Sequence, residues 1–310
     1  MTETLGLVPS CLIPELYAPW KDQPGFVAQQ VETIVADGFY RSIELSPVQL
    51  QEDRLRIRRA CEENSVYVAT WLTSVLEQQG LDIDTVDESQ RQQSVEAVKQ
   101  LLPAAVECGS KTVALVGGAD PGPSLRARGY DSCYKSLVEI SAAAADLGVA
   151  VMMEPLDRFA QKKRLVGPTP EAVELFARVR AEQPTFGFAF DTAHAALNEE
   201  HCTEALQQAG DQLVNLHLSN AVLDPRDPLY GDRHMMPGKP GFLTEARAAE
   251  IIAEAARIEA RQGQNIRVAI EARALATSGK QDTAKLCLDF LKAAFAQAEK
   301  IYVPSERIGA

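Results

Sequence analysis

Gly148-Val149-Ala150-Val151-Met152-Met153-Glu154-Pro155 is a short apolar run that ends on a carboxylate. Because this run is too short for a helix and stands between glycine and proline, it predicts a buried β-strand over residues 149–155. Apolar residues on either side recur with helical spacing, which predicts helices over residues 130–147 and 170–181. The stretch is therefore one strand within an alternating pattern of strands and helices.

The same alternation runs through the whole chain. Further strands are predicted over residues 5–13, 40–45, 66–72, 112–116, 186–191, 213–218 and 266–271. Further helices are predicted over residues 25–37, 51–64, 88–108, 199–209, 243–262 and 281–300. Strict alternation implies parallel strands joined by right-handed crossovers, and eight such units fit a closed barrel better than an open sheet. We therefore predict an α/β fold, a single (β/α)8 TIM barrel over residues 1–310.

The main competitor to the barrel is a doubly wound sheet. That fold normally carries a glycine-rich phosphate turn after its first strand. Here the corresponding segment reads Ile13-Pro14-Glu15-Leu16, without such a turn and without a phosphate-binding lysine. The sequence therefore favours the barrel.

Composition limits the classes of function. The chain has 31 Lys and Arg against 43 Asp and Glu, a net charge of −12, which disfavours binding to nucleic acid. It contains no run of 18 apolar residues and no signal-like N-terminus, so we expect a cytoplasmic protein without a membrane partner. With only four histidines, any metal site must draw most of its ligands from carboxylates.

Four consecutive predicted strands end in residues that could ligate a metal. These residues are Glu154, Asp191, His217 and Glu271. One acid at a strand end commonly caps the next helix, but the carboxyl ends of all barrel strands meet at one mouth. Carboxylates crowded there repel one another, and a divalent cation removes that repulsion. Three carboxylates and one imidazole favour Mn²⁺, with Mg²⁺, Co²⁺ and Zn²⁺ as alternatives.

Other polar groups near the mouth are candidates for substrate contacts. His194 follows Asp191 by three residues and is predicted to contact substrate or a second metal. The long segment of residues 224–242 offers Asp232, Arg233 and His234. A loop of this length over a barrel mouth is usually functional.

Aromatic and charged side chains after the early and middle strands add further candidates. Trp71 and Trp20 are candidates for an apolar wall on which a sugar stacks, with core packing as the alternative. Arg158, in a basic loop after residue 155, is a candidate clamp on the substrate, with a solvated turn as the alternative. Glu44 is a candidate for a hydrogen bond to a substrate hydroxyl, or a structural acid.

Five motifs, in order along the chain, resemble those of the xylose isomerase-like barrels. They read MMEPLDRF at 152–159, FDTAHA at 190–195, NLHLSN at 215–220, DRHMMPGKPG at 232–241 and AIEAR at 269–273. That family includes sugar isomerases and epimerases and also endonuclease IV. The resemblance implies that Glu154, Asp191, His217 and Glu271 bind metal, that the two glutamates also serve as acid and base, and that His194 contacts substrate.

The DRH segment resembles two different patterns within this family. The likeness to endonuclease IV implies that Asp232 and His234 hold a further zinc, whereas the likeness to many epimerases implies a basic residue that contacts substrate. Endonuclease IV is expected to carry additional histidines on its early strands, and residues 1–193 contain none. A phosphodiesterase of that type is therefore the minor alternative.

These residues suit chemistry next to a carbonyl group. Isomerising or epimerising a keto-sugar requires removal of a proton beside the carbonyl and stabilisation of the enediolate that forms. Glu154 and Glu271 are predicted to take and return the proton, without an assignment of which does which. A lyase or dehydratase acting on a keto-sugar or a sugar conjugate is the alternative enzyme. The sequence leaves open which sugar binds, whether it is phosphorylated, and whether the chain forms homo-oligomers.

Overall fold

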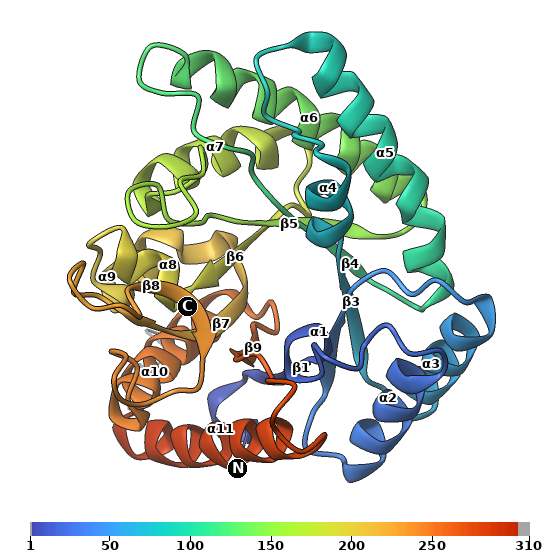
Figure 1. Ribbon diagram of the computed structural model, residues 1–310, viewed down its shortest axis with the longest axis vertical. Coiled ribbons are helices and arrows are strands. Elements are labelled where there is room, and N and C mark those ends of the chain that lie inside the picture. The colour runs from blue at the N-terminus through green and yellow to red at the C-terminus, as the bar shows by residue number, and fades with distance from the viewer. Residues whose placement is uncertain (1, 303–310) are drawn as a thin grey trace, which may run out of the picture.

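A computed structural model of the chain describes residues 2–302, and its centre is a closed barrel of eight parallel strands (Figure 1). The barrel strands are β1 (Val8–Leu12), β2 (Ser42–Leu45), β3 (Tyr67–Trp71), β4 (Thr112–Val116), β5 (Ala150–Glu154), β6 (Gly187–Asp191), β7 (Leu213–Val222) and β9 (Arg267–Glu271). Each pairs with its neighbours in parallel, and the pairings of β6 with β7 and of β9 with β1 close the ring. The predicted TIM barrel is confirmed.

Figure 1 shows the long helices arranged around the outside of these strands. They are α2 (Phe26–Asp37), α3 (Gln51–Glu63), α5 (Glu88–Glu107), α6 (Arg126–Asp146), α7 (Thr169–Glu182), α9 (Cys202–Ala209), α10 (Glu245–Gln262) and α11 (Asp282–Ile301). All eight were predicted; the largest boundary difference is that α6 begins four residues earlier than expected, at Arg126. Among residues 2–302, no helix combines the length and the apolar content needed to cross a membrane.

Several short elements were not predicted. The helices α1 (Ile13–Leu16), α4 (Thr73–Gln79) and α8 (Thr192–Leu197) follow strands β1, β3 and β6 almost directly. Single turns of 3-10 helix cover Thr2–Leu5 and Gly210–Gln212. These elements are too short to show a full hydrophobic period in the sequence.

The segment predicted as a long loop contains a ninth strand, β8 (Gly231–Met235). It pairs antiparallel with the last part of β7, which continues to Val222, well past its predicted end. Pairing covers the backbone groups of β7 that emerge from the barrel. It also brings Asp232 and His234 to the mouth.

The core has two layers because side chains alternate along each strand. Met153 points outward into the large layer between strands and helices, whereas Met152 belongs to a small cluster inside the barrel. This inner cluster contains the small side chains Ala69, Ala114, Ala189 and Ala269. The same alternation directs Glu154, two residues after Met152, into the barrel mouth.

Candidate active site

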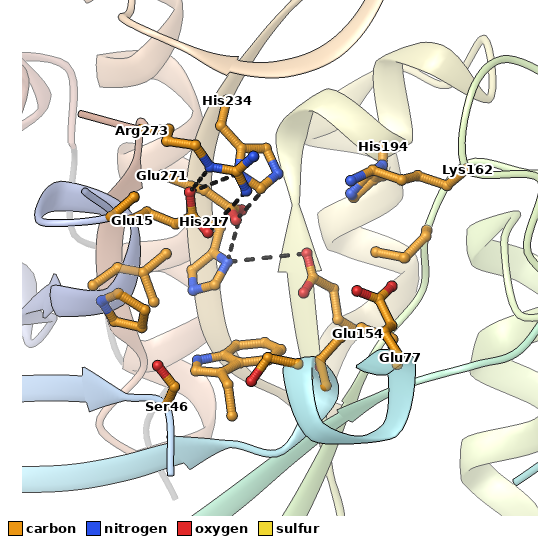
Figure 2. Close-up of a pocket in the computed structure, with 18 of the residues that line it drawn as sticks. Glu15, Ser46, Glu77, Glu154, Lys162, His194, His217, His234, Glu271 and Arg273 are labelled. Atoms are coloured by element: carbon orange, nitrogen blue, oxygen red, sulfur yellow. Dashed lines mark hydrogen bonds and ion pairs between the residues drawn. The ribbon is translucent and has the colours of Figure 1, made fainter. Parts of the chain in front are cut away.

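The four residues at the strand ends converge at the barrel mouth. Glu154, Asp191 and Glu271 are the last residues of β5, β6 and β9, and His217 lies opposite Asp191 in the register of β7. One ligand atom of each residue lies within 4.8 Å of the others. The imidazole Nδ1 of His217 is 3.2 Å from Glu271 Oε2 and 3.9 Å from Glu154 Oε1 (Figure 2).

The hydrogen bonding of Asp191 indicates whether these four residues fit a metal ion. Asp191 caps helix α8, where its Oδ1 accepts the backbone N–H of His194 at 2.9 Å. Its Oδ2 is buried and has no hydrogen-bond partner within the part of the chain that the structure describes. Buried carboxylate oxygens almost always have a partner, so this oxygen is free to meet a cation. The donor set of three carboxylates and one imidazole fits a divalent ion.

The two glutamates of the set differ in proton affinity. Burial raises the pKa of Glu154 to about 8, helped by Glu271 and Asp191 and opposed by His217. Burial also favours the neutral form of Glu271, but the charges of His234 and His217 outweigh it and hold the pKa of Glu271 well below its usual range. Without a cation, their surroundings thus shift the pKa values of these two carboxyl groups in opposite directions.

We call Glu154, Asp191, His217 and Glu271 the metal set. A second polar cluster, built around His234, lies beside it. The ring Nδ1 is 2.9 Å from Glu15 Oε2, and the ring Nε2 is 2.9 Å from Asp232 Oδ2 and 3.6 Å from Glu271 Oε1. Against burial, these carboxylates raise the pKa of His234 to about 11. His234 also has φ of 47°, a backbone conformation uncommon outside glycine, which is often found at functional positions.

This second cluster already contains its own positive charge. Arg273 donates to both oxygens of Glu15, at 2.6 and 3.0 Å, and its Nη2 lies 2.8 Å from His234 Nδ1. A guanidinium in contact with Glu15 and His234 repels a further cation at this position. Glu15, His234 and Glu271 bring ligand atoms within 4.8 Å of one another, but Arg273 and its charge disfavour the additional zinc that the likeness to endonuclease IV implied.

His194 is held between two carboxylates on the other side of the mouth. Its Nδ1 lies 3.2 Å from Asp157 Oδ2, and its Nε2 lies 3.8 Å from Asp232 Oδ2. Lys162 Nζ is 3.3 Å from the same oxygen of Asp232. Figure 2 shows His194 and Lys162 together, across from Glu15 and Arg273.

A cavity of about 290 Å³ connects these groups. It is lined by Glu154, His217 and Glu271 of the metal set, together with Glu15, Lys162, His194, His234, Arg273 and Trp71. Two of the predicted candidates lie elsewhere. Trp20 packs half-buried against the outer core, and Glu44 is fully buried beneath the cavity without lining it.

Two predicted substrate contacts do not line the cavity. Arg233 is exposed to solvent on β8. Arg158 is buried, and its guanidinium donates to Glu171 Oε1 at 2.8 Å, to the carbonyl of Leu165 at 2.5 Å and to Tyr130 Oη at 2.6 Å. These partners take both Nη groups of Arg158, so its side chain holds the loop after β5 and does not line the cavity.

We therefore expect Arg158→Met to reduce stability and leave substrate affinity unchanged. The carbonyl of Leu165 and the hydroxyl of Tyr130 lose a donor, which costs about 1–3 kcal/mol of unfolding free energy. Urea denaturation measures this loss. The matched control is Arg226→Met, whose side chain is 90% exposed beside Asp224, with an expected change below about 0.5 kcal/mol. A higher KM with unchanged stability would contradict this assignment.

The residues that line the cavity include Glu15 and Arg273, which were not among the sequence candidates, and Lys162, which the sequence did not single out within its basic loop. Glu15 lies three residues past the end of β1, and Arg273 lies two residues past the end of β9. Because both residues follow the ends of predicted strands, the sequence could have placed them at the barrel mouth. Lys162 carried no such signal, because it stands next to Lys163 in a basic loop and the sequence does not distinguish the two.

Comparison with known sequences places this geometry in a family. A sequence model described as xylose isomerase-like TIM barrel matches residues 31–255. Three members of the metal set, Glu154, Asp191 and His217, fall inside that range. A search of curated protein sequences found no match.

Solved structures with the same fold include enzymes of more than one kind. The structure of L-ribulose 3-epimerase matches with TM-score 0.71 and 15% identity, covering 98% of this chain and 100% of that chain. D-psicose 3-epimerase with D-tagatose from Clostridium cellulolyticum H10 matches with TM-score 0.65 and 15% identity, covering 95% and 96%. AP endonuclease, family 2 from Brucella melitensis matches with TM-score 0.63 and 16% identity, covering 89% and 96%. At such identities the likeness establishes the fold alone.

Proposed function

This chain belongs to the xylose isomerase-like TIM barrel family, and on that premise we propose that it is a metal-dependent isomerase or epimerase of keto-sugars. The observation that carries this proposal is the convergence of Glu154, Asp191, His217 and Glu271 at the barrel mouth, where three of them, Glu154, His217 and Glu271, line one cavity. The 3-epimerase names of several structural neighbours support it. The proposal includes a single domain over residues 1–310, of which the structure describes 2–302, and action on a small carbohydrate in the cytoplasm.

Glu154, Asp191, His217 and Glu271 would hold the divalent ion. When bound, the ion supplies Lewis-acid stabilisation of the negative charge that develops on the substrate oxygens. We favour Mn²⁺, with Mg²⁺, Co²⁺ and Zn²⁺ as alternatives, because the donors are mostly carboxylate oxygens.

Proton transfer falls to the two glutamates. One carboxylate removes the proton next to the carbonyl, and the other glutamate delivers a proton to the adjacent carbon or to the other face. His194 and His234 line the cavity on two sides and would hydrogen-bond the sugar hydroxyls. Trp71 would form the apolar wall beneath the sugar ring.

Solvent deuterium exchange tests this function. The protein, loaded with Mn²⁺, is incubated in deuterated water with D-fructose, D-tagatose, D-psicose and L-ribulose, and the products are followed by NMR. We expect deuterium beside the carbonyl together with an isomer or epimer of the sugar. Exchange accompanied by loss of water would identify a dehydratase instead. Absence of exchange with every one of these sugars would count against the isomerase proposal.

Lys162 offers a test of how the cavity binds its substrate. We expect Lys162→Met to raise KM about tenfold and change kcat less, because a hydrogen bond from a charged group contributes about 1.5–3 kcal/mol. Asp232 keeps His234 as its partner, so the network stays charge-paired. The control is Lys163→Met, which changes the exposed neighbour in the same loop and should leave both constants unchanged. Equal effects of the two substitutions would rule out a direct contact by Lys162.

A further inference from the structure

Glu44 is a carboxylate fully buried inside the barrel, and no lysine or arginine among residues 2–302 pairs with it. It lies on β2, and donors surround it on both oxygens. Ser10 Oγ donates to Oε1 at 2.8 Å, and Trp71 Nε1 donates to Oε2 at 2.7 Å. His217 Nε2 lies 2.9 Å from Oε2, and Asn215 Nδ2 lies 3.4 Å from it. A charge buried this deeply is costly unless it is paired, so its partners require an explanation.

Two of these partners belong to the candidate active site. His217 is the imidazole of the metal set, and its other nitrogen, Nδ1, faces Glu271 and Glu154. Trp71 lines the cavity, with its ring centroid 5.0 Å from that of His217. One carboxylate therefore holds both the imidazole of the metal set and the indole of the cavity wall.

The chemistry of imidazole gives this contact a consequence. A neutral imidazole carries one N–H and one lone pair, and the hydrogen bond at one nitrogen decides which nitrogen has the proton. When Nε2 donates its proton to Glu44, the lone pair must lie on Nδ1. Nδ1 is the nitrogen that faces the carboxylates of the metal set.

We propose that Glu44 is a positioning residue that fixes the tautomer of His217 and the place of Trp71. With Glu44 in place, the neutral ring of His217 presents its lone pair at Nδ1, toward the other residues of the metal set. Without Glu44, Nδ1 of His217 can carry the proton, and an N–H at this position would be repelled by a cation. His217 would hold the ion together with the other residues of the metal set, and the bound ion would supply positive charge that reaches Glu44 through the imidazole. This inference rests on the proposed metal site.

Three variants separate positioning from simple structural support. Glu44→Ala removes the acceptor, whereas Glu44→Gln keeps an amide oxygen that can accept from His217 and Trp71. The matched control is Glu259→Gln, which changes another buried carboxylate that accepts the backbone N–H groups of Asn265 and Ile266 at 2.9 and 3.0 Å. Both Glu259 and Glu44 are buried acceptors, but Glu259 contacts no residue of the metal set.

The first readout is metal affinity, measured by titration with Mn²⁺ alone. Residues that orient a metal-ligating histidine typically change affinity by about 10–100-fold when replaced. We expect a loss of that size for Glu44→Ala, a smaller loss for Glu44→Gln, and none for Glu259→Gln. If both Glu44 variants bind Mn²⁺ as the wild type does while their melting temperatures fall, Glu44 is only structural and the proposal is wrong.

The second readout is the tautomer itself. The chain has four histidines, so the ¹⁵N spectrum of the zinc-loaded protein is simple, and His217→Gln assigns the signal. We expect Nε2 to carry the proton in the wild type and in Glu44→Gln. In Glu44→Ala we expect a mixture of tautomers or loss of the zinc-bound signal. An unchanged His217 signal in Glu44→Ala would overturn the proposal.

The third readout follows Trp71. The chain has two tryptophans, so Trp71 is the only tryptophan in a Trp20→Phe background, and excitation that is selective for tryptophan reports on it alone. We expect its emission to shift in Glu44→Ala and to remain close to wild type in Glu44→Gln. These binding readouts do not require turnover. Failure of the deuterium-exchange test therefore leaves them interpretable, and failure of the Glu44 tests leaves the proposed reaction standing.

Discussion

Glu271→Gln is expected to lower the formation of isomer or epimer by about 10²–10⁴-fold, the usual contribution of a general acid or base. The amide has nearly the same shape as the carboxylate but cannot accept the proton. Since Glu271 ends β9 without being part of the hydrophobic core, the barrel should remain folded. Product formation is measured at saturating Mn²⁺, and circular dichroism checks the fold.

The matched control for this variant is Glu77→Gln. Glu77 lies on the rim of the same cavity, half exposed and paired with Arg164 at 2.6 Å. Its neutralisation should leave product formation within about threefold of wild type, since exposed ion pairs contribute little. A Glu271→Gln protein with full metal content and wild-type turnover would remove Glu271 from the mechanism.

Glu154→Gln assigns the two roles when it is compared with Glu271→Gln. Both variants should lose product formation. The variant that keeps its proton-abstracting carboxylate should still exchange the substrate proton with solvent, whereas the variant that lacks it should not. If only one variant still exchanges the proton, the glutamate that remains in that variant is the base. Exchange in neither variant at full metal occupancy would mean that both glutamates act in the same proton-transfer step.

The strand ends of the metal set were predictable because two simple regularities locate them. Strand position follows from short apolar runs between helices, and the barrel rule brings the carboxyl ends of all strands together. These two regularities were enough to predict Glu154 and Asp191 at the barrel mouth, without knowledge of side-chain geometry. The fold itself was predictable for the same reason.

Charge partners, by contrast, could not be predicted from sequence. Arg158 and Lys162 belong to one basic loop and carry the same charge. In the folded chain Arg158 donates hydrogen bonds to Glu171 and to the carbonyl of Leu165, whereas Lys162 lines the cavity. Long-range pairs such as His217 with Glu44, 173 residues apart, leave no periodic trace in the sequence. Such contacts depend on the register of the closed barrel.

Metal removal should change stability as well as activity. Dialysis against a chelator is expected to abolish turnover, and Mn²⁺ should restore it. At a free concentration of 100 times its Kd, a ligand that binds only the folded state stabilises it by about 2.7 kcal/mol. Differential scanning fluorimetry should therefore show a rise in melting temperature of several degrees on addition of Mn²⁺. An enzyme that turns over fully after exhaustive chelation would contradict the metal dependence.

Asp191→Asn gives the sharpest test of the metal site. Its effect on the melting temperature should have opposite signs in the metal-free protein and in the protein with Mn²⁺. In the metal-free protein Asp191 lies near Glu154 and Glu271, and burial together with the charges of Glu271 and Asp232 raises its pKa well above the usual range. The amide removes this repulsion and can still accept from His194, so the metal-free variant should melt higher than metal-free wild type. With Mn²⁺ the order should reverse, since the variant has lost a ligand.

The same substitution at Asp232 provides the control. Asp232 is equally buried but lies beside Lys162 and His234, at 3.3 and 2.9 Å. Asp232→Asn should therefore lower the melting temperature with and without Mn²⁺, and the shift that Mn²⁺ produces should persist. If Asp191→Asn also melts lower in both conditions, the carboxylates at the barrel mouth do not repel one another in the metal-free protein. The assignment of these carboxylates to a cation site would then be wrong.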